Sequence, residues 1–359
     1  MVITNAMTSH INVAIIGAGA AGLYAAALLE RSDIGAVVLE ARDRIGGRLL
    51  SVDVEGGRVD LGATWFWPNE QRITQLITDT DLAPFPQHLA GDMMYQPDES
   101  GTRRLDGNQL DQPSGRLPSG MQSIPDFLAG QLTKTAVQLS TIVTAITKHE
   151  DALRVTTDQG DWSAEHVILA TPPALAMESV DFGDGLGSQI AGLARSTPIW
   201  MGATVKVVAV YHQPFWRDEG LAGAAFSHVG PMREVHDMSG PEGLPAALFG
   251  FCALPAGAPA PTEAEAVDQL VELFGERAGD PTALHIMDWR SEPFTSPSTV
   301  ERLTNYQTYG HPLFQEPSLG GRLHWASTET SPVAPGHIEG ALTAAERAVN
   351  AITALRGQP

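Results

Sequence analysis

Near the start of the chain, the pattern of hydrophobic and polar positions changes from that of a strand to that of a helix and back to that of a strand. An apolar run over residues 11–16 is followed by a glycine-rich turn, an Ala- and Leu-rich stretch that reaches Leu29, and a second apolar run over residues 36–39 that ends in an acid, Glu40. Short apolar runs predict buried strands, and the Ala/Leu stretch predicts a helix. Strand, turn, helix and strand in this order predict one βαβ unit, the building block of a doubly wound α/β fold.

The rest of the chain carries further strand and helix patterns. Apolar runs and alternating positions predict strands over residues 49–54, 142–146, 152–156, 167–170, 201–211, 246–252 and 284–289, and a hairpin around residues 93–95 and 103–105. Caps and apolar faces predict four more helices: after Asn69, from Ser123, after Thr262 with Glu265 in a capping box, and from about Ile338 to about Leu355.

The turn after the first strand reads Gly17-Ala-Gly19-Ala-Ala-Gly22 and has the spacing of a dinucleotide-binding turn. Gly17 permits the tight turn, Gly19 lets the backbone approach a pyrophosphate, and Gly22 lets the helix pack against the strand. The helix then begins with Ala20 and Ala21, at an end whose unpaired amides and positive dipole favour phosphate groups.

The end of the second strand adds an acid and two arginines. Glu40 is placed to accept hydrogen bonds from ribose hydroxyls and to repel a 2′-phosphate, which favours FAD or NAD over NADP. Arg42 and a Gly-Gly-Arg turn containing Gly47 and Arg48 bring flexible backbone and guanidinium groups back to the phosphates. With Ala41 between the acid and Arg42, this stretch resembles the FAD-containing amine oxidases, and the resemblance implies FAD.

A second segment carries the same resemblance. Residues 58–67 are similar to the DxGAxW segment of that family, whose backbone runs beside the isoalloxazine ring. The resemblance implies that Gly62, Ala63, Thr64 and Trp65 line the flavin. It also implies that the backbone of Val143 lies against the adenine, while an ordinary buried strand valine is an equally open interpretation of its side chain.

The third matching segment lies near the C-terminal end. A Thr-Glu-Thr turn that contains Glu329 and the stretch over residues 336–342 resemble the C-terminal FAD signature of the family. The resemblance implies that Glu329 binds near the ribityl or phosphate part of FAD. It also implies that the helix start at His337 and Ile338 directs amides at the pyrimidine edge of the ring, where negative charge develops on reduction.

Lys206 interrupts an otherwise apolar predicted strand. One interpretation is a lysine at a sheet edge or one whose ammonium extends to solvent. The resemblance offers another, because the family's corresponding strand, followed by a Phe-Trp pair, carries a lysine that holds a water near flavin N5. Phe215 and Trp216 stand at the matching distance. The catalytic interpretation is favoured, since a buried charge must find a partner.

Trp65, Trp289 and His337 are the expected substrate-facing residues. By resemblance Trp289 lies beside the flavin, with core packing as an equal alternative. His337 occupies the place of a cage tyrosine, and the partner cage position falls near Thr299, which is not aromatic. A neutral imidazole could stack or accept a hydrogen bond, whereas a charged one would repel an ammonium. The position of covalent attachment in some relatives falls near Ser298, so FAD is expected to be non-covalent.

The segments predict an α/β fold in which a doubly wound, Rossmann-like FAD-binding domain is interleaved with an α+β substrate domain. The FAD-binding domain is expected over residues 1–82, 117–184 and 295–359, and the substrate domain over residues 185–294. Residues 83–116 replace the long helical insert of typical family members. The roof over the active site is therefore expected to be reduced or supplied by another subunit.

Composition restricts the partners. With 22 basic and 42 acidic residues among 359, the net charge of −20 opposes non-specific nucleic-acid binding. Cys252 is the only cysteine, which excludes an intrachain disulfide and a cysteine metal cluster, and no metal site is predicted. No signal peptide or membrane span is recognised, so a cytoplasmic protein is expected. A homo-oligomer is left open.

These features predict an FAD-dependent oxidoreductase. The expected reaction is hydride transfer from an amine to flavin N5, giving an imine or aldehyde, with molecular oxygen as acceptor and hydrogen peroxide as product. A desaturase or carbon–carbon dehydrogenase is the enzymatic alternative, because such enzymes share the FAD motifs and need no amine cage. A flavoprotein that turns over little and acts through a partner is the third.

Overall fold

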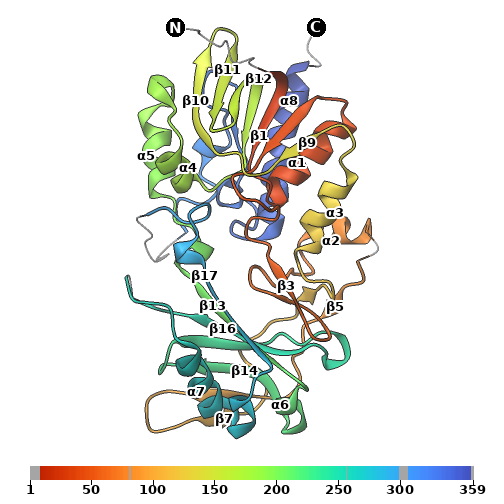
Figure 1. Ribbon diagram of the computed structural model, residues 1–359, viewed down its shortest axis with the longest axis vertical. Helices are drawn as coiled ribbons and strands as arrows, with labels where there is room; N and C mark the ends of the chain where they lie inside the picture. Colours follow the sequence, from red (N-terminus) through yellow and green to blue (C-terminus); the bar gives the residue numbers. More distant parts are fainter. Residues whose placement is uncertain (1–8, 81, 256, 299–305, 357–359) are drawn as a thin grey trace.

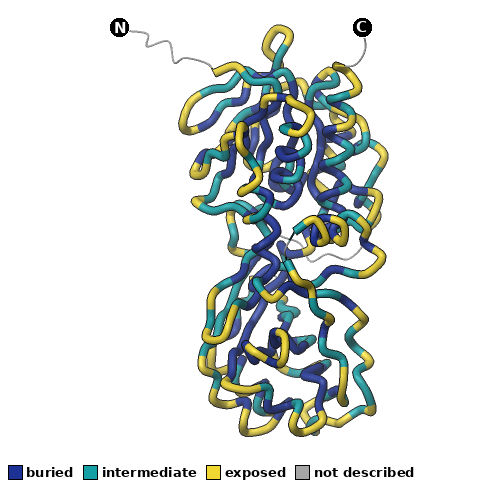
Figure 2. Tube along the Cα trace, turned by 90° about the vertical axis from the view of Figure 1, so that its right-hand side faces the viewer, coloured by how far each residue is buried: buried dark blue, intermediate teal, exposed yellow. Residues whose placement is uncertain are grey.

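The computed structural model describes residues 9–80, 82–255, 257–298 and 306–356. Two sheets lie one after the other along the long axis of the molecule (Figure 1). Buried segments run through both parts and through the narrower region that joins them, and exposed loops surround them (Figure 2). None of the helices in the described part of the chain combines the length and apolar character needed to cross a bilayer.

The first sheet has the strand order β10-β11-β12-β1-β2-β9, with β18 added beside β12. Strands β12, β1, β2, β9 and β18 run parallel to one another, whereas β10, β11 and β12 form an antiparallel meander. Its strands are β1 (Ser9–Ile16), β2 (Ala36–Leu39), β9 (Ala136–Gln138), β10 (Val143–His149), β11 (Ala152–Thr157), β12 (Gly160–Leu169) and β18 (Leu323–Trp325).

Helices cover both faces of this sheet, as a doubly wound fold requires. Along β1, Val13 and Ile15 face a core shared with α1, α2, α3 and α8, whereas Ala14 and Ile16 face a core shared with α4 and α5. The two-residue period of a strand explains this division. The helices are α1 (Ala20–Arg31), α2 (Gln71–Thr78), α3 (Ser123–Gln131), α4 (Pro173–Ser179), α5 (Ser188–Ser196) and α8 (Ile338–Arg356).

The second sheet has the order β17-β13-β16-β15-β14-β6-β7. The predicted hairpin is confirmed as β6 and β7, and β6 joins this sheet beside β14, so part of the short segment 83–116 completes the second unit. Its strands are β6 (Asp92–Gln96), β7 (Arg103–Leu105), β13 (Val205–Tyr211), β14 (Leu221–Ser227), β15 (Met232–Asp237), β16 (Ala246–Cys252) and β17 (Ala283–Asp288).

Smaller elements complete both units. Helices α6 (Phe215–Asp218) and α7 (Glu263–Phe274) pack on one face of the second sheet, and the hairpin β3 (Ser51–Val54) and β4 (Gly57–Asp60) packs on the other. Strands β5 (Phe85–Pro86) and β8 (Gly115–Arg116) form a separate pair. The 3-10 turns are η1 (Gly183–Gly185), η2 (Met201–Ala203), η3 (Pro241–Gly243), η4 (Glu276–Gly279), η5 (Trp289–Ser291), η6 (Pro312–Phe314) and η7 (Thr328–Thr330).

Several local predictions hold and two need correction. The capping box of α7 is present, with the amide of Glu265 donating to Thr262 Oγ1 at 3.2 Å. The N-cap residue of α2 is Glu70 and not Asn69. The strand expected from residue 201 begins at Val205, because η2 precedes it.

Candidate active site

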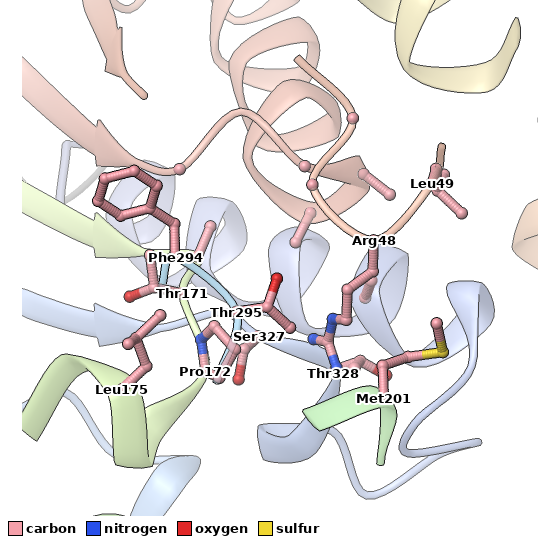
Figure 3. Close-up of a pocket in the computed structure, with 18 of the residues that line it drawn as sticks. Arg48, Leu49, Thr171, Pro172, Leu175, Met201, Phe294, Thr295, Ser327 and Thr328 are labelled. Atoms are coloured by element: carbon pink, nitrogen blue, oxygen red, sulfur yellow. The ribbon is translucent and has the colours of Figure 1, made fainter. Parts of the chain in front are cut away.

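A cavity of about 440 Å³ runs between the carboxyl ends of the first sheet and the second sheet. The predicted site residues that line it are Gly17, Gly19, Ala20, Ala21, Glu40, Ala41, Arg42, Gly47, Arg48, Gly62, Ala63, Thr64, Trp65, Val143, His337 and Ile338. Those that do not line it are Gly22, Lys206, Trp289 and Glu329. In Figure 3, Phe294, Thr171 and Leu175 group on one side of this cavity, and Arg48 lies with Thr328 and Met201 on the other.

The glycine-rich turn forms one wall of the cavity. Gly17 has φ +103°, a conformation that favours glycine. A Cβ on Gly22 would lie 1.9 Å from the carbonyl oxygen of Gly17, so the helix can approach the turn only with glycine at this position. Gly19 pairs in a β-bridge with Gly46, and the amide of Gly46 donates to the carbonyl of Ala18 at 2.9 Å. The two glycine turns therefore form one continuous backbone surface.

Glu40 connects the second strand to this surface. Its side chain is buried, and its two carboxylate oxygens accept hydrogen bonds from the amides of Ala18 at 2.7 Å and Arg42 at 2.9 Å. A carboxylate held by two amides is fixed at the cavity wall with lone pairs still available for hydroxyl donors. The geometry is compatible with the ribose contact predicted for Glu40.

The guanidinium of Arg42 binds mainly to protein groups, whereas the sequence predicted a contact with the phosphates. Its guanidinium donates to Glu292 Oε2 at 2.7 and 3.0 Å and to Thr295 Oγ1 at 2.7 Å. Its main ion pair therefore joins the first sheet to the segment after η5. Arg42 still lines the cavity, but its donors are largely used within the protein, so a phosphate contact depends on the remaining donors.

Arg48 and Glu329 form a two-point ion pair. Arg48 Nη1 lies 2.5 Å from Glu329 Oε1, and Nη2 lies 3.2 Å from Oε2. The Glu329 side chain is 0% exposed, whereas that of Arg48 is 21% exposed and lines the cavity. Glu329 therefore faces the cavity through Arg48, and its place near the ribityl or phosphate part of FAD stays a prediction.

Lys206 lies in the centre of the second sheet, on β13 between β16 and β17, and is fully buried. This excludes a lysine at a sheet edge or one extending to solvent. Its Nζ donates to the carbonyl of Gly62 at 2.9 Å and to Thr64 Oγ1 at 2.6 Å, and lies 4.1 Å from the centre of the Phe249 ring. Lys206 therefore reaches the cavity through two residues that line it.

Burial lowers the pKa of Lys206 to about 7, against the opposing charge of Asp60. Asp60 is also buried, and burial raises the pKa of its carboxyl, although Lys206 acts in the other direction. Both shifts have desolvation as their main cause, because each group loses water and gains only a distant counter-charge.

The low pKa of Lys206 predicts a pH-dependent stability. Between about pH 7 and the unfolded value of about 10.4, the unfolded chain holds a proton that the folded chain has released. The free energy of unfolding should therefore rise with pH, by up to about 1.4 kcal/mol per unit from this group. Urea unfolding at pH 7.5 and 9 should show this rise in the wild type and its loss in Lys206→Met.

A second lysine provides the control for that measurement. Lys148 is exposed, so Lys148→Met should keep the wild-type pH dependence. An equal slope in the Lys206→Met and wild-type proteins would contradict the titration assigned to Lys206.

The end of the cavity beside the second sheet is aromatic. Trp65 lies here, its indole donating to Gln87 Oε1 at 2.9 Å, and its ring contacts His236, Phe249 and Phe251. Further aromatic residues that line the cavity are Trp67, Trp200, Phe251, Phe294 and Tyr306. Sequence reasoning missed them as site residues, although Trp67 belongs to the same segment as Trp65 and offered a signal.

His337 stands beside this aromatic group, immediately before α8. Its Nδ1 lies 2.6 Å from Glu70 Oε1, and its ring packs on Trp67 with 4.5 Å between ring centres. Two rings this close leave no space between them for a substrate. The predicted partner position, Thr299, lies outside the described residues.

The start of α8 places backbone amides beside His337. The amide of His337 donates to the carbonyl of Ala334 at 3.1 Å, whereas the amide of Ile338, a residue that lines the cavity, has no partner within the described part of the chain. The contact of these two amides with the ring edge stays a prediction.

Trp289 packs in the core. Its side chain is fully buried, and its indole donates to the carbonyl of Leu61 at 2.9 Å. Trp289 therefore packs in the core, as one of the two interpretations expected. It can influence the cavity through Leu61, which precedes the lining residue Gly62.

Similarity to known protein families identifies the cofactor of this cavity. A model of the flavin-containing amine oxidoreductases matches residues 100–353, and a model of NAD(P)-binding Rossmann-like domains matches residues 15–80. The chain belongs to the flavin-containing amine oxidoreductase family. As a member of this family it is an FAD-dependent oxidoreductase that acts on amines.

Relatives of this amine oxidoreductase cover almost all of its length. A Mycobacterium tuberculosis protein that carries the name flavin-containing monoamine oxidase is 27% identical over 460 aligned positions, covering 99% of this chain and 100% of that protein. Human amine oxidase B is 25% identical, with 98% and 88% covered. Since 460 positions exceed the 359 residues here, these relatives carry residues that this chain lacks, in agreement with a shortened insert.

Solved structures support the fold of the amine oxidoreductase. Cyclohexylamine oxidase from Brevibacterium oxydans superposes with a TM-score of 0.85, and a putrescine oxidase with 0.81. Each is 21% identical and covers 97% of this chain and 100% of that structure. The predicted fold class, a Rossmann-like FAD-binding unit with a second α+β unit, is confirmed.

The cavity of this amine oxidoreductase fits FAD. At the glycine turns the backbone itself forms the cavity wall, and a Cβ on Gly22 would collide with that backbone. Glu40 lies at the end of β2. Arg48 supplies a cation to the cavity, and the Ile338 amide is without a partner among the described residues. These groups would hold the phosphates, a ribose and the ring edge of FAD.

Proposed function

We propose that this protein oxidises a primary or secondary amine and uses molecular oxygen as the electron acceptor, with hydrogen peroxide as the second product. The observation that carries the proposal is one cavity that joins a dinucleotide-type wall to an aromatic end. Among the described lining residues, the aromatic end has no carboxylate, so the site suits an amine with an apolar substituent rather than one with a second cationic group.

FAD bound here supplies the oxidising chemistry by accepting a hydride from the carbon next to the amine nitrogen. The protein contributes position and exclusion of water. Trp65 and Phe251 form apolar walls, and Trp67 with His337 forms another. An apolar wall favours the neutral amine, the form whose nitrogen lone pair assists the loss of hydride, because desolvation disfavours the ammonium.

The proposal assigns Lys206 to the reaction with oxygen. Its buried Nζ donates to Gly62 and Thr64, which both line the cavity, so in the protonated form, which is populated below its pKa of about 7, its charge acts on the cavity from behind that wall. A fixed positive charge in a low-dielectric site stabilises the negative charge that develops as oxygen is reduced.

Lys206→Met is expected to slow the reaction of the reduced enzyme with oxygen by about 100-fold, the size of effect associated with loss of one preorganised donor. FAD affinity should change little, because Lys206 does not line the cavity. Stopped-flow mixing of the reduced protein with oxygenated buffer measures the rate, with Lys148→Met as control. An unchanged rate would remove Lys206 from the oxygen reaction.

The acceptor and the substrate class can be tested together. Purified protein is supplied with a panel of amines in air, and hydrogen peroxide is measured with a peroxidase-coupled dye. Sustained peroxide production that requires an amine with a hydrogen on the carbon next to nitrogen is the expected result. Flavin reduction without peroxide would exclude oxygen as acceptor, and a flavin that ignores every amine would favour desaturation or action through a partner.

Further properties belong to this proposal. FAD is held without a covalent bond: Cys252 is buried on β16 outside the cavity, and Ser298 contacts Glu178 instead. The site residues act as assigned above, with Val143 beside the adenine and Trp65 beside the substrate. A cytoplasmic location, a homo-oligomer and the five-segment domain boundaries rest on sequence alone.

A further inference from the structure

We infer that His337 and Glu70 form a base that removes the proton from the substrate ammonium before oxidation, an inference that rests on the proposed function. A simple amine has a pKa near that of lysine, about 10.4, so it arrives mostly as an ammonium at neutral pH. An ammonium has no lone pair with which to assist the loss of hydride. A base in the cavity would let the enzyme use the abundant charged form.

The carboxylate half of the pair is rigidly placed. Glu70 is buried at the N-cap position of α2, where the helix dipole favours a negative charge. Its Oε2 accepts the amide of Trp67 at 2.9 Å, and its Oε1 lies 2.6 Å from His337 Nδ1. An ionised carboxylate can only accept, so the hydrogen in this contact belongs to Nδ1.

The imidazole half borders the cavity. Because Nδ1 donates to Glu70, the ring lone pair is on Nε2, which has no hydrogen-bond partner within the described residues. Packing on Trp67, with 32° between the planes, holds the other side of the ring. The side chain is 43% exposed and lines the cavity, so both substrate and solvent can reach Nε2.

The surrounding charges suit a proton acceptor. Glu70 is the ionisable side chain that contacts the ring. From α8, Glu339 is already engaged by Arg72 and the amide of Ile73, and from η7, Glu329 is paired with Arg48. When Nε2 takes up a proton, the new positive charge is therefore balanced by the adjacent carboxylate of Glu70.

The step balances without another reactant. The N–H bond of the ammonium breaks, its electron pair stays on the amine nitrogen, and the proton forms a bond to Nε2. The amine is then neutral and is not repelled by the imidazolium. Its hydride goes to FAD, and the proton on Nε2 leaves through the exposed edge of the ring to solvent.

The first test measures the ring directly and needs no turnover. Protein labelled with ¹⁵N-histidine is titrated at pH 8 with tert-butylamine, which has no hydrogen on the carbon next to nitrogen and cannot be oxidised. His337→Phe identifies the signal by its absence. The expected result is a shift of Nε2 from the unprotonated to the protonated range on binding. A ring already protonated in the free protein, or unprotonated in the complex, would overturn the inference.

The second test is kinetic. The rate constant for anaerobic flavin reduction by an oxidisable amine is measured below saturation from pH 7 to 9. His337→Phe should make it rise about tenfold per pH unit, following the neutral amine, and should lower it at pH 7 by about 100-fold. The wild type should vary much less with pH, and Glu70→Gln should lie between them. His149→Phe, at an exposed histidine, is the matched control.

The two tests distinguish an error in the base assignment from an error in the proposed function. If amines reduce the wild-type flavin but the His337→Phe profile matches the wild type, only the base assignment is wrong. If no amine binds or reduces the wild-type protein at any pH, the proposed function fails and the base assignment fails with it.

Discussion

Replacing Arg48 by methionine should lower the free energy of unfolding by about 3–5 kcal/mol, because it leaves the fully buried carboxylate of Glu329 without its partner. FAD affinity should also fall, roughly tenfold to a hundredfold, since Arg48 lines the cavity and supplies a cation to it. Urea unfolding and titration of the apoprotein with FAD measure the two losses separately.

A double substitution separates these two roles. Arg48→Met combined with Glu329→Leu removes both charges, and a buried pair replaced by apolar groups is often neutral for stability. The double variant should therefore recover most of the unfolding free energy while FAD binding remains weak. If the double variant is as unstable as Arg48→Met, the loss does not come from an unpaired carboxylate.

Replacing Gly22 by valine should give a protein that is purified without flavin. The added Cβ alone would lie 1.9 Å from the Gly17 carbonyl oxygen and 3.1 Å from its carbon, so the turn must move away from the helix. Overpacking of this kind costs about 1–3 kcal/mol, and it displaces the backbone that approaches the phosphates. FAD affinity is expected to fall at least about 100-fold, measured by flavin fluorescence after ultrafiltration.

Gly192→Ala is the matched control. Gly192 lies inside α5, and an added Cβ there meets nothing within 4 Å. This substitution should keep FAD and raise stability by up to about 1 kcal/mol, because alanine is the better helix former. Retention of FAD by the Gly22→Val protein would contradict the placement of the phosphates at this turn.

Local patterns predicted the frame of the molecule well. The βαβ unit around Gly17, the capping box at Thr262 and the final helix from Ile338 each depend on residues close in sequence. The sequence also favoured an interior position for Lys206, since the surrounding strand is almost wholly apolar, and the structure places it there. Such features follow from propensity, capping and periodicity.

The internal ion pairs could not be predicted. Arg48 meets Glu329 over 281 positions of sequence, Arg42 meets Glu292 over 250, and His337 meets Glu70 over 267. Each pair is created when separate segments pack on the same wall, and no local pattern contains that information. The same reason explains why the sequence did not reveal that Arg48 lies between Glu329 and the cavity.

The aromatic end of the cavity shows a second limit of prediction from sequence. Trp200 lies just before η2, where periodicity predicted a strand close by, and Tyr306 follows a segment outside the described residues. Both line the cavity because a loop and a turn converge there. Irregular segments place side chains by tertiary packing, so sequence periodicity carries little information about them.

The visible absorption spectrum of the purified protein, recorded without oxygen before and after adding amines, tests the central claim most directly. The account predicts oxidised-flavin bands that bleach when an amine with a hydrogen on the carbon next to nitrogen is added and return when air is admitted. A protein without flavin that cannot be reconstituted with FAD, or flavin bands that no amine bleaches at any pH, would contradict it.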